Sequence, residues 1–219
     1  NSAGRLLFWR FLTGFTLAGI FPVGMKIAAD YFREGLGKPL GYLVGALVLG
    51  TAFPHLLKTF TGAGDLPWSL VIIATSIGAA LGGFLILLFV PPGPYRKAGT
   101  GKDFLVFFNV FRNRKFRAAA FGYFGHMWEL YTFWAFVPVI LAAYNLLNPQ
   151  ANIDVSLTSF LVIGLGSLAC VVGGYLSQRI GTKRTAGTAL FLSGVCCILS
   201  PFVFLQSSPE LLTAFLIFW

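Results

Sequence analysis

Charged residues are scarce in this sequence, and acidic ones are the scarcest. Asp, Glu, Lys and Arg make up 11% of the 219 residues, and only 7 of them are Asp or Glu. A chain with so little charge cannot cover an apolar core with a polar surface, so the soluble globular classes are excluded. Hydrophobic residues account for 57% of the chain, and the mean hydropathy is +0.80. The composition therefore predicts a protein of the lipid bilayer.

Cysteine and histidine are also rare, with 3 and 2 residues respectively. Cys170, Cys196 and Cys197 lie in apolar segments, and no C-x-x-C pair is present. This spacing indicates no metal site, no redox motif and no disulfide framework. The sequence also has no Walker motif, so direct drive by ATP is not indicated. We expect no cofactor and no enzymatic activity.

Apolar runs of roughly 20 residues recur along the chain, and this is the length at which a helix crosses about 30 Å of hydrocarbon. We expect an all-α polytopic membrane protein with six complete spans and the start of a seventh. The predicted spans are Leu6–Ala29, Pro39–Leu57, Trp68–Val90, Ala118–Leu147, Leu157–Ser177 and Thr185–Gln206, with the seventh beginning near Leu211. The chain starts without Met and stops inside an apolar run, which we interpret as an internal piece of a longer protein.

Lysine and arginine are concentrated in alternate loops. They are Arg33 and Lys38; then Arg96, Lys97, Lys102, Arg112, Arg114, Lys115 and Arg117; then Arg179, Lys183 and Arg184. The positive-inside rule places these loops in the cytoplasm. The formal charge of +9 therefore reports membrane topology, and it argues against a nucleic-acid surface because the basic residues sit at membrane ends.

The longest connection divides the chain into three parts. Residues 1–90 are predicted to end one helical bundle, residues 91–117 to form a cytoplasmic central loop, and residues 118–219 to begin a second bundle. Within the loop, Phe104–Arg117 has aromatic rings followed by cations, as in a helix that lies at the membrane interface. This stretch is either a membrane-lying linker or a regulatory docking site.

One basic segment between two apolar runs carries a family resemblance. The stretch Gly174–Arg184 reads G-Y-L-S-Q-R-I-G-T-K-R, which resembles the loop motif of the major facilitator superfamily, with a glutamine where that motif usually has aspartate. The resemblance implies a gating loop that stabilises one transport state from the cytoplasmic side. Its predicted members are Gly174, Gln178, Arg179, Gly181, Lys183 and Arg184.

The same family resemblance extends along nearly the whole chain. Arg10-Phe11-Leu12-Thr13-Gly14 resembles the R-x-x-x-G core of the fourth helix of such transporters, and Gly41, Gly45, Gly50 and Pro54 resemble the small-residue face of the fifth. The chain is thus similar to helices 4 to 10 of the twelve. The resemblance implies alternating access, in which two bundles rock about a central site.

Few polar residues lie inside the spans, and each costs a few kcal/mol at mid-membrane unless it is paired or hydrated. Glu129 lies near the bilayer centre, with His126 one turn earlier on the same helical face. Glu129 could take up and release a proton, with His126 tuning it. The alternative is that Glu129 accepts hydrogen bonds from neighbouring helices and locks their packing.

Three further residues complete the predicted pathway. Arg10 either reaches the headgroups or faces the cavity, where it could hold an anion. Tyr131 and Trp134 either form an aromatic wall for an organic substrate or pack in the bundle.

Lys26 is expected to reach the interface and pair with Asp30 at i+4.

These observations predict secondary active transport of a small solute by alternating access, coupled to protons by symport, with an organic anion as a candidate substrate. The alternative is a receptor or scaffold that keeps the fold without transporting. The expected partners are the lipid bilayer, the solute and protons, with no nucleic acid. We expect a monomeric multi-pass protein of the plasma membrane, or of the inner membrane if the source is bacterial.

Overall fold

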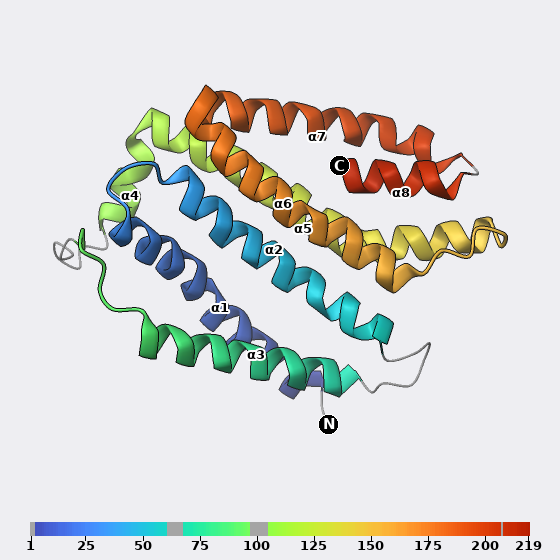
Figure 1. Cartoon of the computed structure of the whole chain (residues 1–219), viewed down its shortest axis with the longest axis horizontal. Helices are drawn as coiled ribbons and strands as arrows, with labels where there is room; N and C mark the ends of the chain where they lie inside the picture. The colour runs from blue at the N-terminus through green and yellow to red at the C-terminus, as the bar shows by residue number, and fades with distance from the viewer. Residues whose placement is uncertain (1–2, 61–67, 97–104, 207) are drawn as a thin grey trace.

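A computed structural model describes residues 3–60, 68–96, 105–206 and 208–219. These residues form helices and no strands, and six helices are long and apolar enough to span a membrane. The helices are α1 (Ala3–Tyr31), α2 (Gly37–Phe60), α3 (Trp68–Phe89), α4 (Leu105–Arg112), α5 (Arg114–Leu147), α6 (Val155–Ile180), α7 (Thr182–Phe204) and α8 (Pro209–Phe218) (Figure 1). The predicted all-α fold with six complete spans and a shorter seventh helix is confirmed.

Helices α5, α6 and α7 extend beyond the predicted apolar runs at the ends that carry basic residues. Helix α5 begins at Arg114 instead of Ala118, because the side chain of Asn113 caps its first turn by accepting from Lys115 N at 2.9 Å. Helix α6 continues to Ile180, and only Gly181 separates it from α7. Hydropathy marks where a helix leaves the hydrocarbon, whereas basic residues with good helix propensity let it continue into the interface.

The short helix α4 lies within the stretch predicted to be interfacial. It ends at Arg112 and is followed directly by Asn113, which caps α5. The single interfacial helix predicted over this stretch is therefore two helices, α4 and the start of α5, that meet at a corner. The rings of Phe111 and Phe116 close this corner, with centroids 5.4 Å apart at an interplanar angle of 89°. Phe104, the first residue of the predicted stretch, lies outside the described residues.

In chain order the helices fall into two groups, α1–α3 and α5–α8, and the most extensive helix–helix contact joins α2 of one group to α6 of the other (Figure 1). The C-terminal end of α1, the N-terminal end of α2, the start of α5 and the α6–α7 junction gather at the same end of the molecule. Three of the basic loops belong to this end, as the predicted topology requires. The division of the chain into two bundles of a larger assembly stays a prediction.

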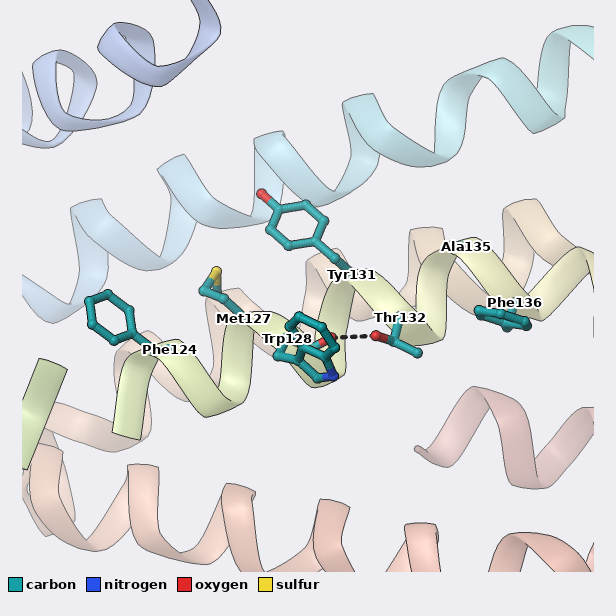
Figure 2. Close-up of a pocket in the computed structure, with 7 residues that line it drawn as sticks. All are labelled: Phe124, Met127, Trp128, Tyr131, Thr132, Ala135 and Phe136. Atoms are coloured by element: carbon teal, nitrogen blue, oxygen red, sulfur yellow. Dashed lines mark hydrogen bonds between the residues drawn. The ribbon is translucent and has the colours of Figure 1, made fainter. Parts of the chain in front are cut away.

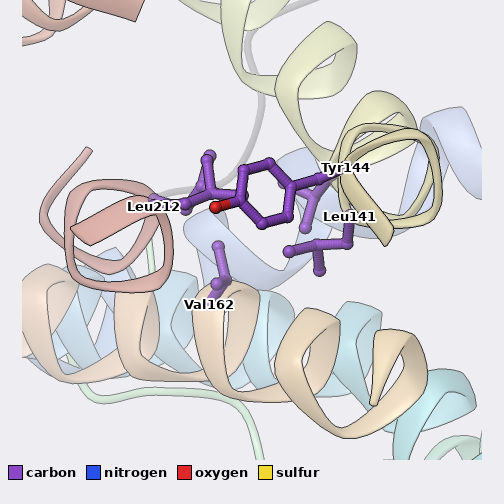
Figure 3. Close-up of a cluster of buried hydrophobic side chains, with 6 residues drawn as sticks. Leu141, Tyr144, Val162 and Leu212 are labelled. Carbon is purple, nitrogen blue, oxygen red and sulfur yellow. The ribbon is translucent and has the colours of Figure 1, made fainter. Parts of the chain in front are cut away.

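The best-packed core of the second group lies between α5, α6 and α8. Leu141 and Tyr144 of α5 point toward Val162 of α6 and Leu212 of α8 (Figure 3), and all four are at most 4% exposed. The α5–α6 connection is held by Asn145, whose amide donates to the Ile153 carbonyl at 2.8 Å and accepts from the Ile153 amide at 3.1 Å. These contacts fix three of the four helices in this group.

The cytoplasmic end of α1 is tied to the chain that leaves α3. The hydroxyl of Tyr31 donates to the carbonyl of Pro91, and the amide of Tyr95 donates to the carbonyl of Asp30 at 3.0 Å. Lys26 pairs with Asp30, which confirms the predicted i+4 ion pair. The Lys26 side chain is 57% exposed, as expected for a lysine that reaches toward the headgroups.

Candidate functional site

Helix α5 carries the predicted pathway residues on two opposite faces. Residues two apart on an α-helix are about 200° apart, so Glu129 and Tyr131 point in nearly opposite directions. Glu129 faces α7, whereas Tyr131 points to the side on which α2 lies (Figure 2). The structure therefore separates the ionisable pair from the aromatic pair, and the four residues do not share one surface.

Glu129 belongs to a hydrogen-bonded network that joins three helices. Its Oε1 accepts from the hydroxyl of Ser193 and, at 3.5 Å, from the thiol of Cys197, both on α7. The indole Nε1 of Trp219, just after α8, donates to the same Ser193 hydroxyl at 3.1 Å. This geometry matches the predicted alternative in which neighbouring helices donate hydrogen bonds to Glu129.

His126 lies on the same face as Glu129, as the sequence predicts. Its Nδ1 is buried and has no hydrogen-bond partner among the described residues. A buried ring nitrogen usually has a partner, because an unsatisfied one costs the desolvation of a polar group. His126 Nδ1 is therefore a place where a further helix, a water or a solute could bind.

Beside the Glu129 face, α5 also carries an open apolar hollow of about 520 Å³. It is lined by Phe124, Met127, Trp128, Tyr131, Thr132, Ala135 and Phe136 (Figure 2). Thr132 adds little polarity, since its hydroxyl donates to the Trp128 carbonyl at 2.7 Å within the helix. The Tyr131 hydroxyl and the indole N–H of Trp128 are thus the polar groups that this surface offers to a solute.

Trp134 does not line the hollow. It packs against Val48 and Ala52 of α2 and Ile163 of α6, and its ring meets that of Tyr131 edge to face with centroids 5.5 Å apart. The sequence left two roles open for this aromatic pair. The surroundings of Trp134 agree with packing in the bundle, and those of Tyr131 agree with a wall that a solute can reach. Trp134 positions Tyr131 by this contact.

Arg10 is exposed on α1, a helix without a buried residue in this structure. It is not brought to the Glu129 network, which lies among α5, α7 and α8. The prediction that Arg10 faces a cavity and the alternative that it reaches the headgroups both stay open.

Of the six predicted gating-loop residues, the structure buries only Gly174, and Gln178 is exposed like the cations. Gly174 is buried against α2, and the Gln178 amide donates to the carbonyl of Gly35, in the connection between α1 and α2. Arg179, Lys183 and Arg184 are exposed on the ends of α6 and α7. The stretch is not a loop, because only Gly181, with φ of 92°, interrupts the helices. Its uncharged members make the inter-group contact.

The glycines near Gly174 form the closest helix contact, which we call the α2–α6 seam. On α2 the seam consists of Gly37, Gly41 and Gly45, and on α6 of Ser167, Cys170 and Gly174. A Cβ at Gly41 would lie 2.9 Å from the Cys170 carbonyl, and one at Gly45 would lie 2.8 Å from the Ser167 carbonyl. Only glycine allows the two backbones to approach this closely. Gly50 has nothing within 4 Å, so the predicted small-residue face ends before it.

Sequence reasoning missed two residues beside the seam, Tyr42 and Tyr175. Their hydroxyls are 3.2 Å apart, and Lys38 Nζ lies 4.7 Å from the centroid of the Tyr175 ring. Tyr175 was inside the quoted motif, but nothing in the sequence indicates a partner 133 residues away. The i+4 spacing of Gly37, Gly41 and Gly45 was the signal that could have located the contact.

Six apolar helices in two groups that meet along a glycine seam define a multi-pass α-helical membrane protein of the transporter type. The family model of the Major Facilitator Superfamily matches residues 1–219. The chain belongs to the major facilitator superfamily, and the predicted resemblance is confirmed.

A relative in Thermus thermophilus, described as a probable nitrate/nitrite antiporter NarK1, is 28% identical over 221 aligned residues. The alignment covers 89% of this chain and 46% of the relative, so the chain spans about half the length of the protein that it matches. No solved structure matches the chain significantly.

Proposed function

We propose that this chain is part of a secondary transporter that moves a small solute by alternating access. The α2–α6 seam carries the proposal, because it is where the two helix groups meet. The backbones touch at the glycines, and polar links and a small apolar cluster of Val48, Ala52 and Ile163 lie beside them. Such a contact can part and reform as one unit. Membership of the major facilitator superfamily supports transport over a receptor or scaffold that keeps the fold.

The proposed substrate is a small anion. The printed name of the Thermus thermophilus relative, a nitrate/nitrite antiporter, supports nitrate and nitrite as the first candidates, with organic anions next. Arg10 is the proposed anion-binding cation on α1, and Tyr131 is a proposed hydrogen-bond donor on α5. That name describes exchange, so we propose anion exchange as the transport mode in place of the symport predicted from the sequence.

A role for protons is the second part of the proposal and depends on Glu129. An ionisable carboxyl inside a span is a candidate for proton uptake. Its hydrogen bonds to α7 and, through Ser193, to Trp219 couple its charge to the position of three helices. Loss of the charge would then favour one arrangement of these helices. His126, with its unpartnered Nδ1, is proposed to tune this step.

The test is transport by the full-length protein in proteoliposomes loaded with nitrite and given external nitrate, then with acetate or lactate. We expect nitrate uptake to depend on internal nitrite, and Arg10→Gln to lower it at least tenfold while Arg5→Gln, on the same exposed helix, changes it less than twofold. Uptake that proceeds equally into empty vesicles would disprove exchange. If no anion in the panel crosses, the proposed substrate class is wrong.

The proposed location is the plasma membrane, or the inner membrane of a bacterium, and the proposed state is a monomer. Both follow from the self-contained two-group architecture of transporters of this type. Fractionation of cells and light scattering of the detergent-solubilised protein would test them.

A further inference from the structure

We propose that the side of α7 that faces away from α5 holds an anionic phospholipid of the cytoplasmic leaflet. The lipid phosphate binds Arg184 and Thr188, and its acyl chain lies over Gly187 against Phe191. We call the surface formed by these four residues and Ile180 the α7 groove. The proposal goes beyond solute transport and does not depend on it.

The α7 groove is an open depression of about 570 Å³ where α6 passes into α7. Ile180, at the end of α6, forms one side, and the other side is formed by Arg184, Gly187, Thr188 and Phe191. The four α7 residues are spaced three and four apart, so they share one face of the helix. A Cβ built on Gly187 would have nothing within 4 Å, so the absent side chain leaves a notch in this face.

The groove lies on the outside of the second helix group. Helix α7 meets α5 through Ser193 and Cys197, which donate to Glu129. Phe191 is two residues from Ser193, so its side chain points about 200° away from the face that meets α5. Phe191 is 71% exposed and Ile180 is 43% exposed. In the described part of the chain, this face is therefore available to lipid.

The order of chemical groups along the groove matches the depth profile of a phospholipid. Arg184 lies in the first turn of α7, at the end predicted to be cytoplasmic, and Thr188 follows one turn later. Phe191 lies about 10 Å from Arg184 along the helix axis. A phosphate at the interface thus meets the cation and the hydroxyl, while the attached chain runs over Gly187 to Phe191. A soluble phosphate would use only the polar end of the groove, so the apolar end favours a lipid.

The two polar side chains of the groove are free to bind a phosphate. Arg184 makes no ion pair or hydrogen bond with any described residue. The Thr188 hydroxyl makes none either, whereas the Thr185 hydroxyl donates to the Gly181 carbonyl at 3.1 Å. A guanidinium can donate two parallel hydrogen bonds to a phosphate, and the first turn of α7 contains no acidic residue to compete. The charge of the groove therefore favours a lipid with a net negative headgroup.

Lys183 distinguishes binding in the groove from general attraction to a basic membrane end. It directly precedes Arg184 and is exposed, but it does not line the groove. Attraction of the anionic leaflet to the whole basic segment would depend on Lys183 and Arg184 alike. A groove that holds the phosphate depends on Arg184 and not on its neighbour.

The experiment uses the full-length protein in phosphatidylcholine nanodiscs that contain a trace of phosphatidylglycerol with a photoactivatable diazirine in its acyl chain. Phosphatidylcholine with the same diazirine is the reference probe, and the labelled residues are located by mass spectrometry. We expect the phosphatidylglycerol probe to label residues 187–191 at least threefold more than the reference probe does. Arg184→Gln should remove this preference, and Thr188→Val should lower it by a smaller factor.

Matched variants test the shape and the charge of the groove separately. Gly187→Leu fills the notch, whereas Gly83→Leu adds the same side chain to α3, about as far from the cytoplasmic end of its helix and also with nothing within 4 Å. We expect Gly187→Leu to lower phosphatidylglycerol labelling at least threefold, and Gly83→Leu and Lys183→Gln to leave it within twofold. Both leucine variants should fold, since leucine favours a helix more than glycine does, and melting curves check this.

Equal labelling of residues 187–191 by the two probes would overturn the proposal, because the groove would then hold surrounding lipid without regard to its headgroup. A loss in Lys183→Gln as large as that in Arg184→Gln would also overturn it, in favour of general attraction to the basic end. No labelling by either probe would mean that another helix of the full-length protein covers the groove.

Soluble glycerol phosphate in excess distinguishes a lipid from a free phosphate. We expect it to leave the labelling unchanged, since it lacks the chain that contacts Phe191. Competition by glycerol phosphate would assign the groove to a soluble phosphate and overturn the lipid proposal. Because this assay measures no transport, its outcome is independent of the proposed anion exchange.

Discussion

A carboxylate inside a membrane span is costly unless polar groups surround it. Glu129 has two such groups on α7, and Ser193 in turn accepts from Trp219, so one side chain connects three helices. Hydrogen bonds to a charged group contribute about 1.5–3 kcal/mol each in proteins. Glu129 therefore contributes to the packing of the second helix group whether or not it also exchanges protons.

Substitution of Glu129 separates these two roles. Glu129→Ala should lower the free energy of unfolding by about 1–3 kcal/mol, because it leaves the Ser193 hydroxyl without its carboxylate acceptor. Glu129→Gln keeps an acceptor oxygen and should cost less than 1 kcal/mol. The measurement is thermal unfolding of the purified protein in detergent. Equal losses in the two variants would contradict the hydrogen-bonding account.

Transport at several pH values then tests the proton role of the same residue. If Glu129 exchanges a proton, Glu129→Gln should make anion exchange independent of pH between 5 and 8, with folding preserved. Ser193→Ala is the control, since it disturbs the network without removing the titratable group. A pH profile that survives in Glu129→Gln would leave Glu129 with a packing role alone.

Tyr131 and Trp134 are neighbours with different surroundings. Trp134→Ala should destabilise the protein by about 1–3 kcal/mol, because Trp134 packs against Val48, Ala52 and Ile163. Tyr131→Phe should leave the melting temperature within 1–2 °C and lower anion exchange, since it removes only a hydroxyl from the open hollow. Melting curves and transport rates of both variants check this division. A large loss of stability in Tyr131→Phe would contradict it.

At the scale of the helix, α2 differs along its length in how closely it meets α6. Gly41→Ala should be destabilising by about 1–3 kcal/mol, because a Cβ there would lie 2.9 Å from the Cys170 carbonyl and the helices would have to separate. Gly50→Ala, on the same helix with nothing within 4 Å, should be neutral or stabilise by up to about 1 kcal/mol. Thermal unfolding of the two variants compares them directly. Similar melting temperatures would mean that the seam is not tightly packed.

The α5–α6 hairpin depends on a single amide that pairs with both backbone groups of Ile153. Asn145→Ala should cost about 1–2 kcal/mol, since it leaves the Ile153 amide and carbonyl to solvent at the membrane surface. Asn109→Ala, on the exposed side of α4, is the control and should stay within ±0.5 kcal/mol. Hydrogen exchange at residues 148–153 should rise in Asn145→Ala alone.

The helices were predictable from sequence because hydropathy over about 20 residues is a strong signal. Their ends were not, since Asn113 caps α5 and a single glycine separates α6 from α7. The Lys26–Asp30 pair was found because both partners lie on one helix. The seam and the Tyr42–Tyr175 contact join residues more than 120 positions apart, and helical periodicity does not indicate which neighbour a face meets.

The candidate site shows the same limit. The sequence placed Glu129 and His126 on one face, and the structure agrees, since helical spacing alone decides this. It also grouped Tyr131 and Trp134 with them, although two residues along a helix turn the side chain by about 200°. The donors Ser193, Cys197 and Trp219 were missed because they come from α7 and the end of α8.

For the molecule as a whole, the arrangement of contacts indicates which side is closed. At Gly37, Gly41 and Gly45 the two helix groups meet backbone to backbone, whereas a Cβ built on Gly164 would lie at an ordinary 3.7 Å from the Ala52 side chain. The closest approach of α2 to α6 therefore lies toward the Gly37 end of α2. Under the proposed alternating access, this is a form closed at the end predicted to be cytoplasmic, and we expect exchange to require separation of α2 from α6 there.

This interpretation predicts that a reversible cross-link between positions 42 and 175 stops transport. The Tyr42 and Tyr175 ring centroids are 6.3 Å apart, so Tyr42→Cys with Tyr175→Cys should be bridged by a short methanethiosulfonate linker in the closed form. Anion exchange should fall to the level of empty vesicles after bridging and return on reduction, because α2 and α6 must part in every cycle. Each single variant, treated in the same way, should keep its activity. Undiminished exchange in fully bridged protein would mean that the cytoplasmic path opens elsewhere, with α2 and α6 moving as one body.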